Sequence, residues 1–139
     1  MHIIFVCTGN TCRSPLAESI AKSQLKDHEI ESRGVYAIDG QPIASESRTL
    51  IENHDLPMVD AAQNFSAKDL SADLILTMTQ THKMVLQTQY PEVAHVYTLK
   101  EYVDEQGDIA DPIGGGPETY QAIYQELDEL IHTLAQKLS

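Results

Sequence analysis

The sequence predicts an α/β fold with a four-stranded parallel sheet. Four short segments that fit strands, two of them apolar runs, alternate along the chain with segments whose apolar residues recur at helical spacing. Strands that alternate with helices in this way form parallel sheets joined by right-handed crossovers. The chain has 139 residues, the size of one domain, and no stretch of linker composition. We therefore expect residues 1–139 to form a single domain.

The first half of the chain contains two expected strands and two expected helices. The apolar run His2–Val6 is bounded by Thr-Gly-Asn and predicts a buried strand. Ser14 then suits the N-cap of a helix, and Pro15 suits its first helical position. A second strand is expected over Ile30–Ala37, followed by a turn at Asp39–Pro42. The next helix is expected over Ser45–His54, with Ser45 as its cap.

The second half of the chain repeats the alternation and ends in the clearest helix. The expected elements are a short helix over Ser66–Leu70, a strand over Asp73–Met78, a helix over Thr79–Gln89, a strand over His95–Leu99, a loop over Gly107–Gly116 and a helix over Pro117–Leu138. The apolar residues of the last helix share one face, as expected of a helix packed on a core. They are Tyr120, Ile123, Tyr124, Leu127, Leu130, Ile131, Leu134 and Leu138.

Composition and charge exclude several classes of protein. The 9 basic and 21 acidic residues give a net charge of −12, which disfavours nucleic acid and anionic lipid as partners. The longest apolar runs, Ile3–Cys7 and Leu74–Leu76, are far shorter than the roughly 18 residues of a membrane span. A polar loop begins at Thr8, before the apolar region of a secretion signal would be complete. We therefore expect a monomeric cytoplasmic protein that binds neither nucleic acid nor membrane.

The two cysteines, Cys7 and Cys12, suggest chemistry rather than structure. Two cysteines alone cannot build a disulfide framework or a four-ligand zinc site. In a reducing compartment such a pair is more often catalytic or redox-active. We expect no metal and no cofactor.

The segment from Cys7 to Pro15 contains the strongest functional signal. Ligands of open α/β sheets bind beyond the carboxyl ends of the strands, and Cys7 directly follows the first expected strand. Inward-facing N–H groups of the next loop, together with a helix N-terminus, would bind an anion. The planar fork of Arg13 can hold two oxygens of a tetrahedral oxyanion. The loop is not a Walker A motif or a dinucleotide fingerprint, because it lacks Gly-Lys-Ser/Thr and contains only Gly9.

The same groups would activate the cysteine. A free thiol is mostly protonated at neutral pH, whereas N–H groups, a helix dipole and Arg13 favour the thiolate of Cys7. A thiolate placed against bound phosphorus indicates phosphoryl transfer through a cysteinyl-phosphate intermediate. The leaving group then needs an acid, and Asp111 is the best candidate because Pro112 restricts its backbone. Asp108 is a weaker candidate.

The active-site loop of the low-molecular-weight protein tyrosine phosphatases resembles the run Cys7-Thr8-Gly9-Asn10-Thr11-Cys12-Arg13-Ser14-Pro15. The acid motif of the same family resembles Asp111-Pro112. The resemblance covers nearly the whole chain. It implies a four-stranded parallel sheet with helices on both faces, a nucleophile at Cys7, a phosphate clamp at Arg13 and a general acid at Asp111. It places Thr8, Gly9, Asn10, Thr11, Cys12 and Ser14 in the substrate-binding loop. It also implies that Asn10 and Ser14 hold the loop and the thiolate, and that Cys12 forms a reversible disulfide with Cys7.

Two positions resemble the bacterial protein-arginine phosphatase branch of this family. Tyrosine-directed members usually carry an aliphatic residue where this chain has Thr11, and tyrosines where Ile113 and the following glycines stand. A guanidinium needs hydroxyl and carboxylate partners, whereas an aromatic ring needs apolar walls. We therefore expect phosphorylated proteins as substrates and phosphoarginine as the hydrolysed group. Phosphotyrosine is the alternative.

Three other functions are weaker alternatives. A thioredoxin-coupled arsenate reductase needs further cysteines, and none follows Cys12. A sugar-transport phosphocarrier needs neither Arg13 nor Asp111. A non-catalytic phosphate-binding module would not need an intact nucleophile and acid. We expect the segment Tyr36–Gln41 to face the pocket, and we expect His54, His82 and Lys83 to be surface residues.

Overall fold

The sheet has four parallel strands in the order β2-β1-β3-β4, which confirms the predicted fold class. The computed structural model describes residues 1–139. The strands are β1 His2–Cys7, β2 Glu29–Gly34, β3 Leu74–Thr77 and β4 Val96–Thr98. The helices are α1 Arg13–Gln24, α2 Ser45–Asn53, α3 Gln80–Gln89, α4 Leu99–Tyr102 and α5 Pro117–Leu138, with a short 3-10 helix, η1, over Ala67–Ser71.

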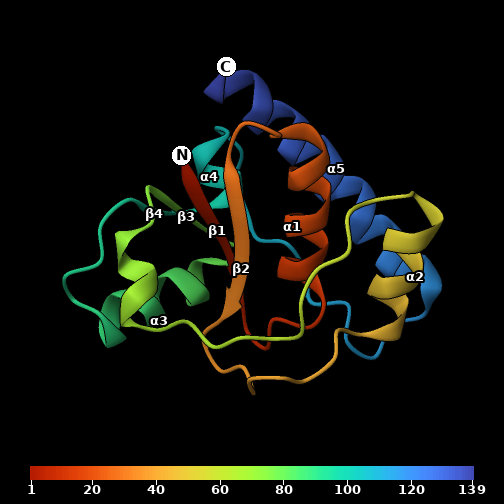
Figure 1. Ribbon diagram of the computed structural model, residues 1–139, viewed down its shortest axis with the longest axis horizontal. Helices are drawn as coiled ribbons and strands as arrows, with labels where there is room; N and C mark the ends of the chain where they lie inside the picture. Colours follow the sequence, from red (N-terminus) through yellow and green to blue (C-terminus); the bar gives the residue numbers. More distant parts are fainter.

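Helices cover both faces of the sheet (Figure 1). Helices α1 and α5 pack on one face over the larger apolar cluster, and α3 packs on the other face over a smaller cluster. Strand β1 lies inside the sheet, so Ile3 and Phe5 point into the first cluster while Ile4 and Val6 point into the second. This two-sided burial explains why the first strand has an unbroken apolar sequence.

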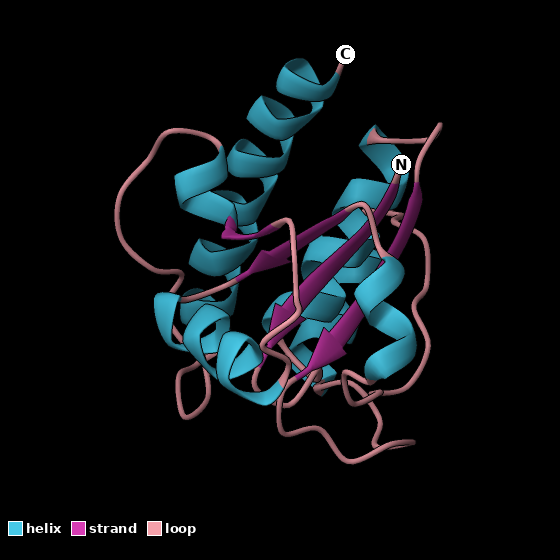
Figure 2. Ribbon diagram, turned by 90° about the vertical axis from the view of Figure 1, so that its left-hand side faces the viewer, coloured by secondary structure: helices cyan, strands magenta, loops and turns pink.

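The carboxyl ends of the strands gather at one end of the sheet, and both chain termini lie at the opposite end (Figure 1; Figure 2 gives the perpendicular view). The loop between β1 and α1 starts at this carboxyl end, directly after Cys7. Residues 107–116, which precede α5, also reach this end, because Ile109 N–H donates to Met78 just beyond β3. The fold therefore brings the two sequence motifs together.

Two expected helix caps are wrong. Helix α1 begins at Arg13 with Cys12 as N-cap, and α2 begins at Ser45 with Ala44 as N-cap. Neither cap makes a side-chain hydrogen bond. Ser14 lies inside the first turn of α1, where its hydroxyl is buried and turned toward Cys7. A serine before an apolar run is a cap signal only when no tertiary contact competes for its hydroxyl.

The other observed boundaries differ from the expected ones by at most three residues at either end, and one short helix was not expected. Strand β2 ends at Gly34 rather than Ala37, and the next two N–H groups donate to the carbonyls of Cys7 and Thr8, where β1 passes into the loop before α1. Helix α4 follows β4 directly and is held by a capping box between Thr98 and Glu101. None of the helices combines the length and the hydropathy required to span a membrane.

Candidate active site

The loop between β1 and α1 presents a row of free amides. The backbone N–H groups of residues 8–12 donate no hydrogen bond within the chain, and they directly precede the N-terminus of α1. Consecutive unpaired amides next to a positive helix end form an anion-binding nest. Thr8, Gly9, Asn10, Thr11 and Cys12 thus share a geometry that suits a phosphoryl group.

Asn10 holds the shape of this loop. Its backbone is in the left-handed region at φ 56°, and its side chain is 3% exposed. Its Oδ1 accepts from the N–H of Gln63 at 2.9 Å, which fixes the orientation of the amide group. Its Nδ2 donates to Ser14 Oγ at 2.8 Å and to Ser32 Oγ at 2.9 Å. Both amide protons are therefore used.

This arrangement fixes the role of the Ser14 hydroxyl. Because Ser14 Oγ accepts from Asn10, its own proton remains to be donated. The Cys7 Sγ lies 2.9 Å from Ser14 Oγ, whereas the other acceptor, the carbonyl of Arg33, lies at 3.3 Å. Donation to a thiolate is charge-assisted and stronger than donation to a carbonyl. The hydroxyl is thus placed to stabilise the ionised form of Cys7.

A buried carboxylate lies at the other end of the same chain of hydrogen bonds. Ser32 Oγ donates to Glu18 Oε1 at 2.5 Å, and Lys22 forms an ion pair with Glu18 at 2.7 Å. Since Ser32 gives its proton to Glu18, it must accept from Asn10, which sets the direction of the whole chain toward Cys7. Sequence reasoning missed Ser32 and Glu18, because their role depends on contacts between α1 and β2.

Arg13 and Asp111 face each other across the loop. The Arg13 side chain is 5% exposed, and its Nη1 donates to the carbonyl of Ile109 at 2.8 Å. Its Nη2 lies 3.9 Å from Asp111 Oδ2, and the Asp111 side chain is 48% exposed. The other Asp111 oxygen accepts from the N–H of Ile113. Asp108, the weaker candidate for the acid, instead accepts from the N–H of Gln80 at the start of α3.

The polar groups of Thr11 and Cys12 have few partners. Thr11 is half-buried, and the one polar neighbour of its hydroxyl is Cys12 Sγ at 3.7 Å. Cys12 is buried, and its sulfur lies 3.6 Å from the hydroxyl of Tyr120 on α5. Burial and the contact with Cys12 raise the pKa of Tyr120, so its hydroxyl stays protonated and can donate to the sulfur. Both cysteines are free thiols in this structure.

Gly34 at the end of β2 is another residue that sequence reasoning missed. A Cβ at this position would lie 2.5 Å from the carbonyl oxygen of Thr8 and 2.9 Å from the amide nitrogen of Asn10. Only glycine allows the strand to approach the loop this closely. Beyond Gly34, Tyr36 donates its N–H to the carbonyl of Thr8, and the side chains of Tyr36 and Ile38 are exposed.

His82 is not a surface residue, so that expectation is wrong. Its side chain is 5% exposed, and its Nε2 lies 2.8 Å from Thr8 Oγ1. Burial, followed by the charge of Arg13, lowers the pKa of His82 from 6.5 to about 4, against the opposing charges of Asp108 and Asp111. The ring is therefore neutral at physiological pH.

The other two residues expected at the surface lie away from the loop. His54 is exposed and stacks on Tyr124 with ring centroids 4.2 Å apart. Lys83 is partly exposed and forms an ion pair with Glu101 at 2.7 Å.

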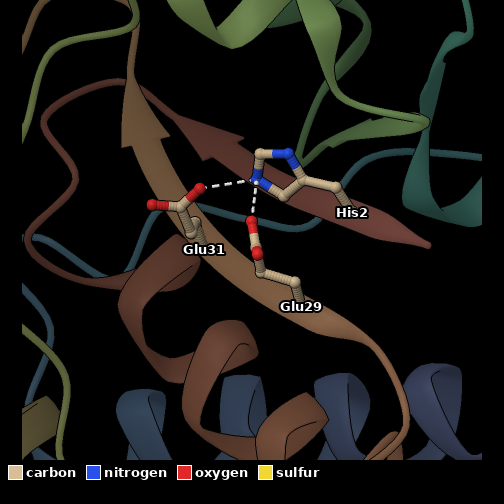
Figure 3. A group of neighbouring side chains, drawn as sticks. All are labelled: His2, Glu29 and Glu31. Carbon is tan, nitrogen blue, oxygen red and sulfur yellow. Dashed lines mark hydrogen bonds and ion pairs between the residues drawn. The ribbon is translucent and has the colours of Figure 1, made fainter.

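One group of side chains has the chemistry of metal ligands, and it lies at the other end of the sheet. His2 on β1 faces Glu29 and Glu31 on β2, and its Nε2 lies 3.3 Å and 2.5 Å from their carboxylates (Figure 3). Glu31 also pairs with Arg33 at 2.9 Å. These contacts with His2 and Arg33 account for the arrangement without a metal ion. The group starts from the amino ends of the strands, whereas the phosphate-binding loop follows their carboxyl ends.

Comparison with known proteins gives a consistent result. The family model described as "Low molecular weight phosphotyrosine protein phosphatase" matches residues 2–139. A curated relative from Staphylococcus haemolyticus, named low molecular weight protein-tyrosine-phosphatase PtpB, is 54% identical over 96% of this chain and 97% of its own length.

Solved structures from two further bacteria have the same fold. The YwlE arginine phosphatase from Geobacillus stearothermophilus superposes with a TM-score of 0.94 at 37% identity, over 99% of this chain and 92% of that one. A low molecular weight protein tyrosine phosphatase from T. tengcongensis superposes with a TM-score of 0.92 at 42% identity, over 99% of both chains. Similar proteins thus carry both substrate names.

Proposed function

The chain belongs to the low molecular weight phosphotyrosine protein phosphatase family and is a protein phosphatase, and we propose that it hydrolyses phosphoarginine in proteins. The observation that carries this substrate choice is Thr11, whose hydroxyl faces no nitrogen or oxygen partner in the chain. A hydroxyl in this state is free to accept an N–H bond from a substrate guanidinium. The likeness to the YwlE arginine phosphatase supports the same choice.

The proposed reaction has two displacement steps at phosphorus. The Cys7 thiolate attacks, the bond from phosphorus to the guanidinium nitrogen breaks, and Asp111 gives its proton to that nitrogen. Asp111 then takes a proton from water, which attacks the cysteinyl phosphate, and inorganic phosphate leaves with Cys7 again a thiolate. Arg13 and the free amides of the loop hold the phosphoryl oxygens in both steps.

Phosphotyrosine hydrolysis is the second candidate, and two observations favour it. The relative that is 54% identical is named a tyrosine phosphatase, as is the T. tengcongensis structure. In addition, Tyr36 and Ile113 are exposed large side chains whose backbone N–H groups contact Thr8 and Asp111. Such side chains suit an aromatic ring as well as the stem of an arginine.

The nucleophile and the clamp are tested by two substitutions. Cys7→Ser should abolish turnover of a phosphoarginine peptide while still binding inorganic phosphate, because the amides and Arg13 are unchanged. Arg13→Lys should also lose turnover, since an ammonium cannot hold two oxygens in one plane. Substantial activity in Cys7→Ser would exclude the cysteinyl-phosphate route, and a near-normal rate in Arg13→Lys would exclude the clamp.

The substrate choice is tested at Thr11. Thr11→Ile removes the hydroxyl and adds an apolar wall, and an unpaired guanidinium donor should cost about 1–3 kcal/mol, or roughly ten- to a hundredfold in rate. Turnover of an aryl phosphate should be spared. Thr11→Val is the matched control, because it removes the hydroxyl without adding bulk. If kcat/KM for phosphoarginine is unchanged in both variants, the Thr11 hydroxyl plays no part in substrate choice.

We also propose that the two cysteines protect each other from oxidation. Cys12 is buried in the loop that begins at Cys7, five residues along the chain. Mild oxidation of Cys7 would give a sulfenic acid, which condenses with the Cys12 thiol to a disulfide and water. Reduction by a thiol would restore the enzyme.

For the protein as a whole, we propose a cytoplasmic monomer that binds no nucleic acid or membrane, as its net charge of −12 favours.

A further inference from the structure

His82 lowers the stability of the fold at its buried position. Its ring is buried, and the Nδ1 atom has no hydrogen-bond partner. A polar atom buried without a partner destabilises a fold, and an apolar side chain of similar size would avoid that cost. The reaction described above makes no use of His82. A buried residue that costs stability and lies next to an active site is a candidate for a role in function.

The unpaired Nδ1 indicates which nitrogen carries the proton. A neutral imidazole has one N–H, and a proton on Nδ1 would be a buried donor with no acceptor. A bare lone pair there is the less costly choice, so Nε2 carries the proton and donates to Thr8 Oγ1 at 2.8 Å. Burial limits rotation of the ring, and the backbone N–H of His82 donates to the Thr79 hydroxyl at the start of α3.

The hydrogen bond from His82 leaves the Thr8 hydroxyl free to act as a donor. Its oxygen accepts from His82, so its own proton remains for another acceptor. Thr8 is exposed and is the first residue after the nucleophile. Helix α3 also holds the loop that carries Asp111, because the N–H of Gln80 donates to Asp108. The Thr8 hydroxyl, bound to His82 two residues further along α3, therefore lies on the side of the loop that faces residues 108–111.

We propose that His82 is a positioning residue that acts through Thr8, and that the Thr8 O–H donates to the bound phosphoryl group on the side from which Asp111 approaches. This inference rests on the proposed phosphatase site and adds a specific donor to it. It also explains why the position holds a polar ring rather than an apolar core residue.

A double-mutant cycle tests the proposal. Thr8→Val removes the hydroxyl, His82→Leu removes the ring donor, and His82→Gln can return an amide N–H near the position of Nε2. Each of the first two changes should lower kcat/KM about two- to tenfold, the worth of one hydrogen bond. The double variant should be no worse than either single one, and His82→Gln should recover part of the loss. Thr81→Val, an exposed change on the same helix turn, is the control.

Stability separates this role from a merely structural one. His82→Leu should melt at the temperature of the wild type or above it, because the unpaired Nδ1 is gone. A drop in melting temperature with unchanged kcat/KM would mean that His82 only supports the fold. Strictly additive losses in the double variant would mean that His82 does not act through Thr8. Either result overturns the proposal.

A binding measurement keeps the test independent of turnover. Titration with inorganic phosphate should give weaker binding in Thr8→Val and in His82→Leu, and the losses of binding free energy should again be non-additive in the double variant. Nitrogen NMR of the His82 ring in the wild type should show the proton on Nε2. If the wild type hydrolyses neither phosphoarginine nor an aryl phosphate but the phosphate cycle holds, the proposed function fails and the Thr8–His82 pair stands. Equal phosphate affinity in all variants, or a proton on Nδ1, would contradict the pair.

Discussion

Ser14→Ala is the substitution whose effects follow most directly from the geometry of the loop. It removes the hydroxyl that lies 2.9 Å from Cys7 Sγ and that accepts from Asn10 at 2.8 Å. A hydrogen bond to a charged group contributes about 1.5–3 kcal/mol, so loss of the bond to the thiolate should lower kcat/KM roughly ten- to 150-fold. The rate of iodoacetamide alkylation of Cys7 at neutral pH should fall with it.

The same change has a second, separable cost. The Asn10 amide loses one buried acceptor, which should lower the free energy of unfolding by about 1–3 kcal/mol. Ser19→Ala is the matched control, because Ser19 is a buried serine of the same helix whose hydroxyl donates to the carbonyl of Pro57. It should lose stability and keep both kcat/KM and the alkylation rate. If Ser14→Ala stays within twofold of the wild-type kcat/KM, the hydroxyl does not stabilise the thiolate.

Three further predictions follow from the same structure. Gly34→Ala should destabilise the protein by about 1–3 kcal/mol and abolish phosphate binding, because a Cβ would meet two backbone atoms of the loop; unchanged binding in a titration would contradict this. The pKa of His82 is lower in the folded protein than in the unfolded chain. As the pH falls from 6.5 to 4, the free energy of unfolding should therefore drop by up to about 3 kcal/mol more in the wild type than in His82→Gln. The same pH dependence of this free energy in both proteins would refute the prediction. Peroxide should inactivate the enzyme reversibly, whereas Cys12→Ser should lose activity for good; a Cys7 sulfinate beside a free Cys12 thiol, found by peptide mapping, would exclude the disulfide.

Local sequence signals predicted the elements whose structure is determined by the residue pattern within the element itself. Helix α5 spans Pro117–Leu138 as expected, because its proline start and its apolar face are both encoded within the helix. Strand β1 was equally clear, since burial on both faces requires an unbroken apolar run. The approach of Asp111 to the cysteine loop was also expected, because the Asp-Pro motif was interpreted together with that loop, and Asp111 lies 3.9 Å from Arg13.

Residues that depend on distant contacts could not be predicted in this way. Ser14 has the local sequence signature of a cap, and only the family resemblance placed its hydroxyl against the Cys7 sulfur, where it lies. His82 stands in a polar stretch that suggests exposure, yet the packing of α3 on the sheet buries it against Thr8. Gly34 gives no turn signal, and its need for glycine comes from a loop that lies far away in the sequence. Each of these roles is set by tertiary structure.

Substrate preference of the unmodified enzyme tests the central proposal most directly. Two peptides of identical sequence, one with phosphoarginine and one with phosphotyrosine at the same position, should be compared by kcat/KM in the same buffer. We expect the phosphoarginine peptide to be hydrolysed with the higher kcat/KM, and Cys7→Ser to hydrolyse neither. A wild type that prefers phosphotyrosine would contradict the assignment of substrate and leave the tyrosine phosphatase alternative in its place.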